Sequence, residues 1–316
     1  MRVLIIGAAG MIGRKLAARL GDLDHLTLVD VVAPTAPPNF PDAEIRTADL
    51  AEPGAAAALL EGRPDLIFHL AAIVSGEAEA DFEKGYRVNL DGTRALFEAI
   101  RHWPEYKPRV VFTSSVAVFG APFPAAIGDE FHTTPLTSYG TQKAIGELLL
   151  ADYSRRGFLD GVGIRLPTIC IRPGLPNKAA SGFFSGILRE PLAGHDAVLP
   201  VSDDVRHWFA SPRAAIGMVL HAATMDTAPL GARRTLSMPG LSATVGEQIE
   251  ALRRVAGDKA VRLIRRVPDP AIEAIVSGWA QNFDARRAES LGFTAETSFD
   301  EIIRAHVEDE LGGQIG

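Results

Sequence analysis

The feature that most constrains the fold of this chain is a glycine-rich turn close to its N-terminus. Four apolar residues, Val3–Ile6, are followed at once by the segment 7–13, which reads Gly-Ala-Ala-Gly-Met-Ile-Gly, and apolar residues then recur with helical spacing. A short, continuous apolar run is typical of a buried parallel strand. A strand, a glycine-rich turn and a helix in direct succession predict the first unit of a doubly wound α/β sheet.

The three glycines of this turn suit the binding of a dinucleotide. The first permits a tight turn, the second lets the backbone approach a pyrophosphate, and the third lets the helix pack close to the sheet. The N–H groups and the dipole at the helix N-terminus favour phosphates there. The spacing is Gly-x-x-Gly-x-x-Gly rather than Gly-x-Gly-x-x-Gly, and a glycine turn without a ligand is the alternative. The residues expected to hold the pyrophosphate are Gly7, Gly10, Met11, Ile12 and Gly13.

Strand-like and helix-like segments alternate through the first half of the chain. Alternating strands and helices predict an α/β fold in which a Rossmann-type, doubly wound parallel sheet is covered by helices on both faces. The strand-like runs lie at 3–6, 26–29, 65–70, 109–114 and 163–166, and the helical segments at 11–20, 55–60, 82–102 and 139–153.

The pattern changes after residue 168. Residues 170–200 are rich in proline and glycine and predict long loops with short helices. We expect a nucleotide-binding domain over 1–168 and a smaller, mainly substrate-binding portion over 169–316, interleaved with the first. The elements predicted in the second portion are helices near 212–225 and 244–256, a short strand at 234–237 and a final helix that ends near 311.

Two acidic residues follow predicted strands and bear on the choice of dinucleotide. Asp30 ends the second strand about 20 residues after Gly10, where a carboxylate accepts hydrogen bonds from the adenosine ribose hydroxyls. No arginine follows it to receive a 2′-phosphate, so NAD is favoured over NADP; a solvated acid at a strand end is the alternative. Asp49-Leu50 follows a third strand and is a candidate to cap the adenine amino group, with a helix N-cap as the alternative.

A tyrosine and a lysine four residues apart lie in the helical segment 139–153. Tyr139 and Lys143 share one helix face. A cation near a phenol stabilises the phenolate and lowers its pKa, which suits a general acid/base. Tyr-x-x-x-Lys also arises by chance, but here it follows a nucleotide-binding turn.

The segment 113–120 ends a strand at the carboxyl edge of the sheet, so a serine there is a candidate to hold a substrate oxygen, with a polar strand cap as the alternative.

Together these features resemble the extended short-chain dehydrogenase/reductase family, which contains sugar-nucleotide epimerases and dehydratases. The segments 69–72 (His-Leu-Ala-Ala), 88–93 (Val-Asn-Leu-Asp-Gly-Thr) and 291–293 (Leu-Gly-Phe) extend the resemblance over nearly the whole chain. The resemblance implies that Ser115 is the catalytic serine. It also implies that Tyr139 is the acid/base and Lys143 its partner.

The resemblance implies further contacts with NAD. Asn89 would be a structural or proton-relay residue, and the segment around Pro167 and Thr168 would lead to the nicotinamide. Ser75 is a candidate for contact with cofactor or substrate, with a simple turn as the alternative. The contacts implied beyond the pyrophosphate and adenosine sites are Leu70, Ala71, Ala72, Ser75, Asn89, Tyr139, Lys143, Pro167 and Thr168.

Within the family, dehydratases carry an acidic pair just after the catalytic serine or threonine, but this chain has Val116 and Ala117 there. The stretches 119–124, 166–174, 177–184 and 204–209 resemble the branch that oxidises D-erythronate, a small sugar acid, at its C2 hydroxyl. That branch implies NAD-dependent formation of a 2-oxo acid, with Tyr139 as the base. The alternatives are a sugar-nucleotide epimerase with tightly bound NAD and a non-enzymatic NAD-sensing regulator.

A small hydroxy acid needs a cation for its carboxylate and polar groups for its hydroxyls. Arginine binds a carboxylate through two parallel bonds, so Arg172 and Arg206 are candidates, together with Lys178 and His207. The alternatives are that Arg206 pairs only with a neighbouring aspartate and that Lys178 is solvated. The residues expected to bind substrate are Ser75, Ser115, Thr168, Arg172, Asn177, Lys178, Ser181 and Arg206.

Composition and charge bear on binding to nucleic acid, on membrane spans and on the cellular compartment. A net charge of −7 over 316 residues argues against non-specific binding of nucleic acid. No apolar stretch approaches the about 20 residues of a membrane span. The lone Cys170 cannot form an internal disulfide, so we expect a cytoplasmic enzyme.

Two expectations concern metals and assembly. No cluster of cysteine, histidine and carboxylate residues has metal-ligand spacing, so no metal is expected. The helices near 82–102 and 139–153 commonly form a dimer interface in the family, which implies a homodimer; packing within one chain is the alternative.

Overall fold

The computed structural model describes residues 1–174 and 181–316, and these residues form two compact units. The chain passes between the units several times. The first unit consists of Met1–Val118, Pro135–Arg165 and Ile216–Leu236. The second unit consists of Phe119–Thr134, Leu166–Ala215 and Ser237–Gly316.

A seven-stranded sheet forms the centre of the first unit, in the order β10-β6-β5-β4-β1-β2-β3. β1 pairs in parallel with both β2 and β4, so the strand order reverses direction at β1 and β4. In doubly wound sheets ligands bind beyond the carboxyl ends of the strands at such a reversal. The predicted Rossmann-type fold is confirmed. The strands are β1 (Arg2–Ile6), β2 (His25–Asp30), β3 (Glu44–Thr47), β4 (Leu66–His69), β5 (Arg109–Ser115), β6 (Asp160–Leu166) and β10 (Thr235–Ser237).

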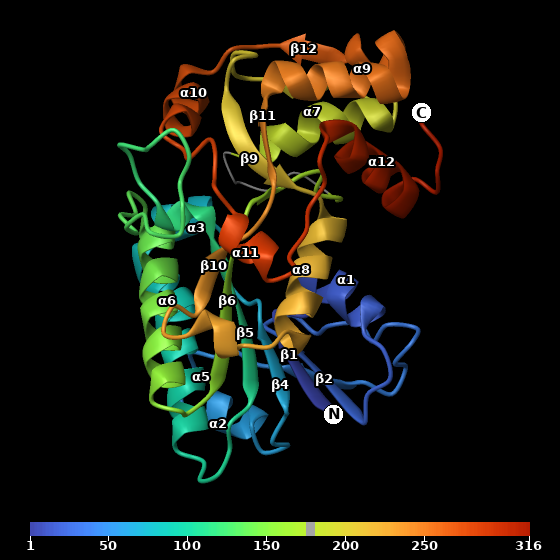
Figure 1. Cartoon of the computed structure of the whole chain (residues 1–316). Helices are drawn as coiled ribbons and strands as arrows, with labels where there is room; N and C mark the ends of the chain where they lie inside the picture. The colour runs from blue at the N-terminus through green and yellow to red at the C-terminus, as the bar shows by residue number, and fades with distance from the viewer. Residues whose placement is uncertain (175–180) are drawn as a thin grey trace. The chain divides into compact units, whose positions relative to one another are not determined.

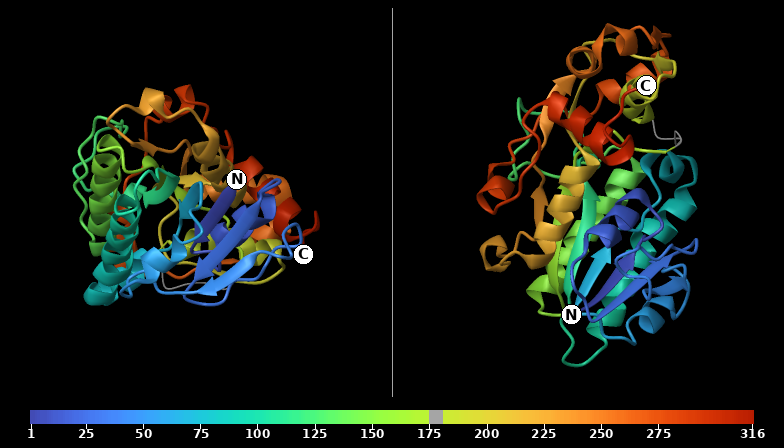
Figure 2. Two further views of the ribbon diagram at one scale, coloured as in Figure 1. Left: turned by 90° about the horizontal axis from the view of Figure 1, so that it is seen from below. Right: turned by 90° about the vertical axis from the view of Figure 1, so that its right-hand side faces the viewer.

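Helices cover both faces of this sheet, as Figure 1 shows for α2, α5 and α6 on one face and the right-hand view of Figure 2 shows for α1 and α8 on the other. Apolar side chains of α5, such as Leu96 and Phe97, are fully buried against the strands. The threonine N-cap of α6, Thr137, accepts a hydrogen bond from the backbone of Gly140 and starts the helix that carries the candidate tyrosine. The helices are α1 (Met11–Arg19), α2 (Ala55–Leu59), α5 (Gly92–Arg101), α6 (Ser138–Arg155) and α8 (Pro212–Thr224).

The segment predicted as one helix over 82–102 is helical but not uniform. It consists of α4 (Phe82–Gly85), a π-helical turn η1 (Tyr86–Asp91) and then α5. π-helical turns are frequent at functional sites, and this one contains the candidate residue Asn89. The short helix α3 (Ser75–Ala80) precedes it, so Ser75 begins a helix rather than lying in a loop.

The second unit has two small sheets. β7 and β11 flank β9, parallel and antiparallel to it respectively, and β8 pairs in parallel with β12. Sequence patterns do not predict β7, β8, β9, β11 or β12, because strands of two to five residues carry little periodicity. These strands are β7 (Thr168–Ile169), β8 (Ala197–Leu199), β9 (Arg206–Ala210), β11 (Leu241–Thr244) and β12 (Ile264–Arg266).

Helices pack on these sheets around a core rich in phenylalanine, leucine and isoleucine. The capping box of Thr244 and Glu247 starts α9, and the final helix, predicted to end near 311, ends at Glu310. The helices of this unit are α7 (Gly182–Leu192), α9 (Val245–Val261), α10 (Pro270–Ser277), α11 (Arg286–Ser290) and α12 (Phe299–Glu310). Short 3-10 turns, η2 (Val116–Val118) and η3 (Ala228–Leu230), complete the chain.

Candidate active site

The glycine-rich turn between β1 and α1 tolerates no side chains at two of its positions. Gly7 has φ +94°, and a Cβ atom there would lie 2.6 Å from the backbone nitrogen of Ala71, in the loop after β4. A Cβ atom at Gly13 would lie 2.3 Å from the carbonyl oxygen of Gly7. Contacts below 3 Å force the backbone apart, so both glycines are needed for the turn to close against α1 and β4.

The start of α1 is open to an anion. Gly10 is the N-cap, no side chain caps the helix, and no acidic residue lies in its first turn. The N–H groups of the first turn therefore have no side-chain acceptor, and they carry the positive end of the helix dipole. Met11 and Ile12 begin the helix beside this opening. The turn fits the pyrophosphate of NAD by this geometry.

The two candidate acids near the adenosine site differ in their partners. Asp30 ends β2 and accepts hydrogen bonds from the backbone nitrogens of Ala9 (2.9 Å) and Val31 (2.7 Å), so it ties the glycine-rich turn to β2. Burial tends to raise the pKa of Asp49, but bonds from the Ala51 N–H and from Arg87 (2.7 Å) hold it below its usual value. Asp49 thus caps a turn, and the neighbouring Leu50 is buried in the core.

Ser115, Tyr139 and Lys143 come from β5 and α6 of the first unit. Ser115 is the last residue of β5, and the half-buried Tyr139 lies in the first turn of α6. The ammonium of Lys143 donates to the carbonyl oxygen of Thr113 (2.8 Å) and lies 5.8 Å from the centre of the Tyr139 ring. A cation close to the face of an aromatic ring is attracted to it. The spacing prediction for this pair therefore corresponds to a real contact.

The glycine after Tyr139 explains how α6 comes so close to β5. A Cβ atom at Gly140 would lie 2.2 Å from the carbonyl oxygen of Ala117. Only glycine permits this approach of the helix to the turn that follows Ser115. Sequence reasoning overlooked Gly140, although its place inside the Tyr-Gly-Thr-Gln-Lys segment was the available signal.

Burial dominates the electrostatics of the tyrosine and the lysine. It raises the pKa of Tyr139 to about 12, and a hydrogen bond with Ser115 works against this rise. Burial also lowers the pKa of Lys143 to about 8, while the negative charge of Glu147 works in the opposite direction. Loss of solvent therefore dominates the pKa of Tyr139 in the protein alone, and the lowering by Lys143 that the sequence predicts stays a prediction.

Asn89 in the π-helical turn joins three segments of the first unit. Its side chain accepts from the backbone nitrogen of Ile73 (2.9 Å) and donates to the carbonyl oxygen of the same residue (3.2 Å). It also donates to the side chain of Gln142 (2.8 Å), one residue before Lys143. These bonds hold the loop after β4 against α6, which agrees with the structural reading of Asn89.

The loop after β4 carries the remaining first-unit candidates. Ala71 faces Gly7 across the closest approach described above, and Leu70 donates its N–H to the carbonyl of Ile6. Ala72 follows them, and the partly buried Ser75 begins α3. All of these residues lie beyond the carboxyl ends of β1 and β4, where the strand order reverses.

In the second unit, Pro167 precedes β7 and is buried, and Thr168 is the first residue of β7. The Thr168 hydroxyl lies 2.7 Å from Nε2 of His207 in β9. His207 is buried, and burial lowers its pKa to about 4, so its ring is neutral near pH 7. Burial and the lowered pKa of His207 argue against it as the cation for a carboxylate, because a desolvated imidazole tends to lose its proton.

The candidate arginines of the second unit differ in their partners. Arg206 bonds to Ser242 and pairs with Glu247 (3.3 Å), rather than with the neighbouring Asp203 or Asp204. Arg172 donates to the hydroxyl of Ser181 (2.9 Å), and no carboxylate in the described parts of the chain lies within 4.0 Å of it. Burial lowers the pKa of Arg172. Asn177 and Lys178 lie outside the described residues.

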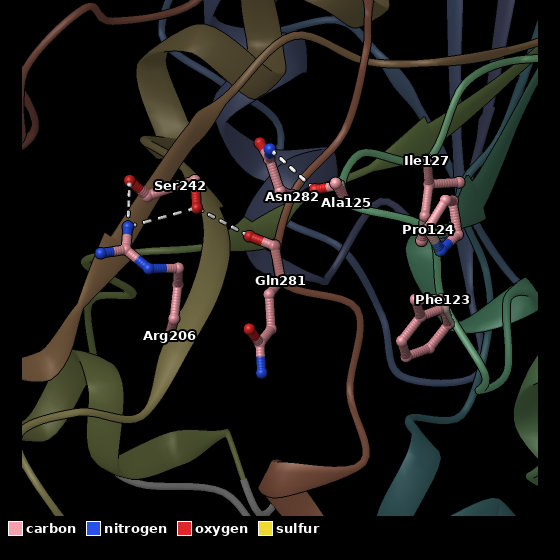
Figure 3. Close-up of a pocket in the computed structure, with 8 residues that line it drawn as sticks. All are labelled: Phe123, Pro124, Ala125, Ile127, Arg206, Ser242, Gln281 and Asn282. Atoms are coloured by element: carbon pink, nitrogen blue, oxygen red, sulfur yellow. Dashed lines mark hydrogen bonds between the residues drawn. The ribbon is translucent and has the colours of Figure 1, made fainter.

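A cavity of about 640 Å³ opens in the second unit beside Arg206. Figure 3 shows the chain of bonds on one wall, in which Arg206 donates to Ser242 and Ser242 donates to the carbonyl oxygen of Gln281 (2.8 Å). Volumes of this order hold drug-sized ligands. The lining residues are Phe123, Pro124, Ala125, Ile127, Arg206, Ser242, Gln281 and Asn282.

Among the described residues, no group of three or more histidine, cysteine, aspartate or glutamate side chains is arranged to hold a metal ion. None of the helices in residues 1–174 and 181–316 combines the length and apolar character needed to cross a bilayer.

Comparison with known proteins places the chain in a family. The model of the NAD dependent epimerase/dehydratase family matches residues 3–227. A D-erythronate dehydrogenase of Cupriavidus necator is 48% identical over 98% of both chains, and one of Haemophilus influenzae is 42% identical over 98% of this chain and all of its own. A crystal structure described as the nucleoside-diphosphate-sugar epimerase from Agrobacterium tumefaciens has a TM-score of 0.98 and 66% identity, covering all of this chain and 96% of its own.

These matches agree with the geometry of the first unit. The sheet order, the glycine-rich turn and the open helix N-terminus are what a bound dinucleotide requires. The predicted family, the predicted cofactor NAD and the predicted class of oxidoreductase acting on a CH–OH group are confirmed. The chain belongs to the NAD-dependent epimerase/dehydratase family.

Proposed function

We propose that this chain oxidises D-erythronate to 2-oxo-D-erythronate with NAD, acting on the C2 hydroxyl. The observation that carries the proposal is the likeness to two D-erythronate dehydrogenases over 98% of the chain. The chain also has a serine, a tyrosine and a lysine at the end of β5 and the start of α6, and these residue types suit an alcohol oxidation. Ser115 works against the rise in the pKa of Tyr139, and the ammonium of Lys143 lies 5.8 Å from the centre of the Tyr139 ring.

Tyr139 acts as the general base in the proposed reaction. Its phenolate takes the proton of the C2 hydroxyl, and Ser115 donates a hydrogen bond to the same oxygen. The C2–H bond breaks as the C2=O bond forms. NAD, when bound, supplies the acceptor for the departing hydride. Because burial raises the pKa of Tyr139, the positive charge of Lys143 is needed to favour the phenolate.

Most of the residues that would hold NAD lie in the first unit, on the loops after its strands and on its helices, and Pro167 and Thr168 are further proposed contacts. The glycine-rich turn would take the pyrophosphate and Asp30 the adenosine ribose. Asp30 keeps NADP out because its carboxylate repels a 2′-phosphate. The other proposed contacts are Asp49, Leu50, Leu70, Ala71, Ala72, Ser75, Asn89, Tyr139 and Lys143.

Arg172 is the candidate that best suits the substrate carboxylate. Its guanidinium is partly buried and has no carboxylate partner in the described residues, whereas Arg206 already pairs with Glu247. A buried cation without a counter-ion is costly unless an anion reaches it. Ser75, Ser115, Thr168, Asn177, Lys178 and Ser181 complete the proposed substrate set, with Arg206 as the second choice for the carboxylate.

The test is a panel of four-carbon sugar acids with NAD and with NADP, followed by absorbance at 340 nm. D-erythronate with NAD should give the highest kcat/KM, and NADP should support little turnover. Chromatography of the product should give the 2-oxo acid, which separates oxidation at C2 from oxidation at C3. No reduction of NAD with any sugar acid in the panel would contradict the proposal.

A sugar-nucleotide epimerase with tightly bound NAD is the second candidate. It is favoured by the 66% identical structure described as such an enzyme and by the cavity of about 640 Å³, which exceeds the needs of a four-carbon acid. The freshly purified protein should then interconvert UDP-glucose and UDP-galactose without added NAD. If neither sugar nucleotide changes while D-erythronate is oxidised, the first candidate stands.

We further propose that the enzyme is a cytoplasmic homodimer. Leu148 of α6 is 68% exposed, so it is available to a partner subunit. Ile145 and Leu149 are partly buried beside it on the same helix. Light scattering on the wild type and on Leu148→Glu tests this, because a charge in a closed interface should shift the protein towards monomer.

A further inference from the structure

A buried histidine in the second unit controls a hydroxyl that the proposed function assigns to ligand binding. His207 in β9 lies between two partners, with Nδ1 2.9 Å from the carbonyl oxygen of Ala280 and Nε2 2.7 Å from the hydroxyl oxygen of Thr168. Its side chain is 4% exposed, while that of Thr168 is only partly buried. The ring is therefore shut off from solvent, whereas Thr168 keeps part of its surface exposed.

The carbonyl of Ala280 settles which ring nitrogen carries the proton. A carbonyl oxygen accepts hydrogen bonds and cannot donate, so Nδ1 must be protonated to form this contact. A neutral imidazole has one N–H and one lone pair. With the proton on Nδ1, the lone pair is on Nε2, and Nε2 accepts the hydroxyl proton of Thr168. The Thr168 hydroxyl is thus committed as a donor inside the protein.

The surroundings of the ring keep it neutral and fixed. Phe184 stacks on it at 5.5 Å with an interplanar angle of 8°, Phe209 meets it edge-on at 5.5 Å, and Trp279 lies 5.3 Å away. These three rings hold the imidazole in place, and burial lowers its pKa and so disfavours the charged form. A flipped ring would place carbon atoms against both Ala280 and Thr168 and lose two hydrogen bonds.

We propose that His207 is a positioning residue that fixes Thr168 as a hydrogen-bond acceptor towards ligand. A hydroxyl has one proton and two lone pairs, and the proton is given to His207. The free lone pairs select a ligand group that donates, such as a substrate hydroxyl or the carboxamide NH₂ of the nicotinamide. They disfavour a ligand carboxylate or keto oxygen at this point. The assignment of Thr168 to ligand contact rests on the proposed function; the direction of its hydrogen bond does not.

The first experiment reads the proton on His207 directly. The protein is labelled with ¹⁵N-histidine, and long-range ¹H–¹⁵N correlations are recorded near pH 7. His207→Phe keeps the aromatic packing, removes both nitrogens and so assigns the signal. The expected pattern is a neutral ring protonated at Nδ1. A ring protonated at Nε2, or at both nitrogens, overturns the proposal whatever the enzyme's substrate is.

The second experiment tests the acceptor with Thr168→Val, which removes the hydroxyl at constant shape, and with Thr168→Ser as the control that keeps it. Loss of one neutral hydrogen bond should lower kcat/KM about three- to tenfold in the valine variant, and serine should restore it. Thermal unfolding of both variants checks that the fold is intact. Equal kcat/KM for wild type, valine and serine variants overturns the proposal.

Ligand analogues then distinguish the two donors. 2,4-Dihydroxybutanoate lacks the C3 hydroxyl of D-erythronate, and 3-acetylpyridine adenine dinucleotide lacks the carboxamide NH₂ of NAD. If the C3 hydroxyl is the donor, the valine penalty disappears with the first analogue; if the carboxamide is the donor, it disappears with the second. 2,3-Dihydroxybutanoate, which lacks the C4 hydroxyl, tests the other non-reacting hydroxyl, and a penalty that persists with all three analogues overturns the acceptor role.

The same design separates failure of this inference from failure of the proposed function. If the wild type oxidises no sugar acid, the proposed function has failed, but the histidine spectrum is still decisive. NAD affinity measured by calorimetry for the wild type, valine and serine variants then replaces the kinetics. His207→Phe should release the Thr168 proton and reduce the discrimination against the analogues, whereas a merely structural histidine would change stability and leave the discrimination intact.

Discussion

The two units hold their candidate site residues by different means. In the first unit, the glycine-rich turn and the Tyr139–Lys143 pair are each contained in one short segment, so the residues that act together are visible in the local sequence, although neighbouring strands and loops also contact them. In the second unit, Thr168 depends on His207, 39 residues away, and His207 depends on Ala280, 73 residues further on.

The same contrast applies to the cations. Lys143 is buried and donates to a backbone carbonyl, so its charge remains available to the neighbouring phenol. Arg206, in contrast, is paired with a carboxylate 41 positions away in the chain, at 3.3 Å. In the first unit, the residue type alone therefore indicates a candidate function. In the second unit, the side chain that a residue pairs with determines whether its charge is free to bind a ligand. Four predictions test this difference, beginning with the largest expected effect.

Removal of the Tyr139 hydroxyl should have the largest consequence. Tyr139→Phe should lower kcat about 10²- to 10⁴-fold, the usual contribution of a positioned acid/base, while the affinity for NAD stays within about threefold. Steady-state kinetics and calorimetry measure the two quantities. Tyr153→Phe is the matched control, because Tyr153 lies on the same helix but its hydroxyl bonds to Glu98. Near-wild-type turnover in Tyr139→Phe would contradict the assignment of Tyr139 as the general base.

The two arginines of the second unit should differ although they have the same chemistry. Arg172→Gln should raise the KM for the sugar acid roughly ten- to hundredfold, as expected for loss of a charged hydrogen bond. Arg206→Gln should change it less than about threefold, because that guanidinium is held by Glu247. A larger effect at Arg206 would reverse the comparison and point to the cavity of Figure 3 as the carboxylate site.

A methyl group in the glycine-rich turn should weaken cofactor binding. The Cβ atom in Gly13→Ala would lie 2.3 Å from a backbone oxygen, so overpacking should lower the free energy of unfolding by about 1–3 kcal/mol. NAD affinity should fall roughly tenfold as the turn is displaced. Gly21→Ala is the control, because nothing lies within 4 Å of the added atom. Equal NAD affinity in both variants would show that the conformation of the glycine-rich turn does not determine NAD binding.

The smallest expected effect is on stability in acid. Burial holds the pKa of His207 near 4, below the ordinary value of 6.5 in the unfolded chain. Between these two pH values the unfolded state binds more protons, so the free energy of unfolding falls as the pH drops from 6.5 towards 4. The contribution of His207 is at most about 3 kcal/mol. Urea unfolding at several pH values should show a shallower decline for His207→Phe than for the wild type.

The exposed His102 provides the control for this last experiment. His102→Gln should follow the wild-type decline, because its side chain does not lose water on folding. A decline in His207→Phe as steep as that of the wild type would mean that this ring is not buried and neutral in solution. The acceptor role of Thr168 would then lose its basis as well.

Much of the first unit was predictable from local patterns. The apolar runs of β1, β2, β4 and β5 and the turn after β1 fell where the structure has them, because buried parallel strands leave continuous apolar segments. The boundaries of α6 were predicted within two residues. The π-helical turn around Asn89 was not predicted, since the apolar spacing of residues 82–102 differs little between an α-helix and one interrupted by a single wider turn.

The sequence by itself determined the fold class, the cofactor, the family and the order of the first unit's elements, because each depends on spacing within one segment. Only the tertiary structure decided that burial opposes ionisation of Tyr139, that His207 is neutral, that Arg206 is paired and that Arg172 has no carboxylate partner among the described residues. Desolvation and pairing depend on neighbours brought together from distant parts of the chain, and no local pattern of residues records which neighbours those are.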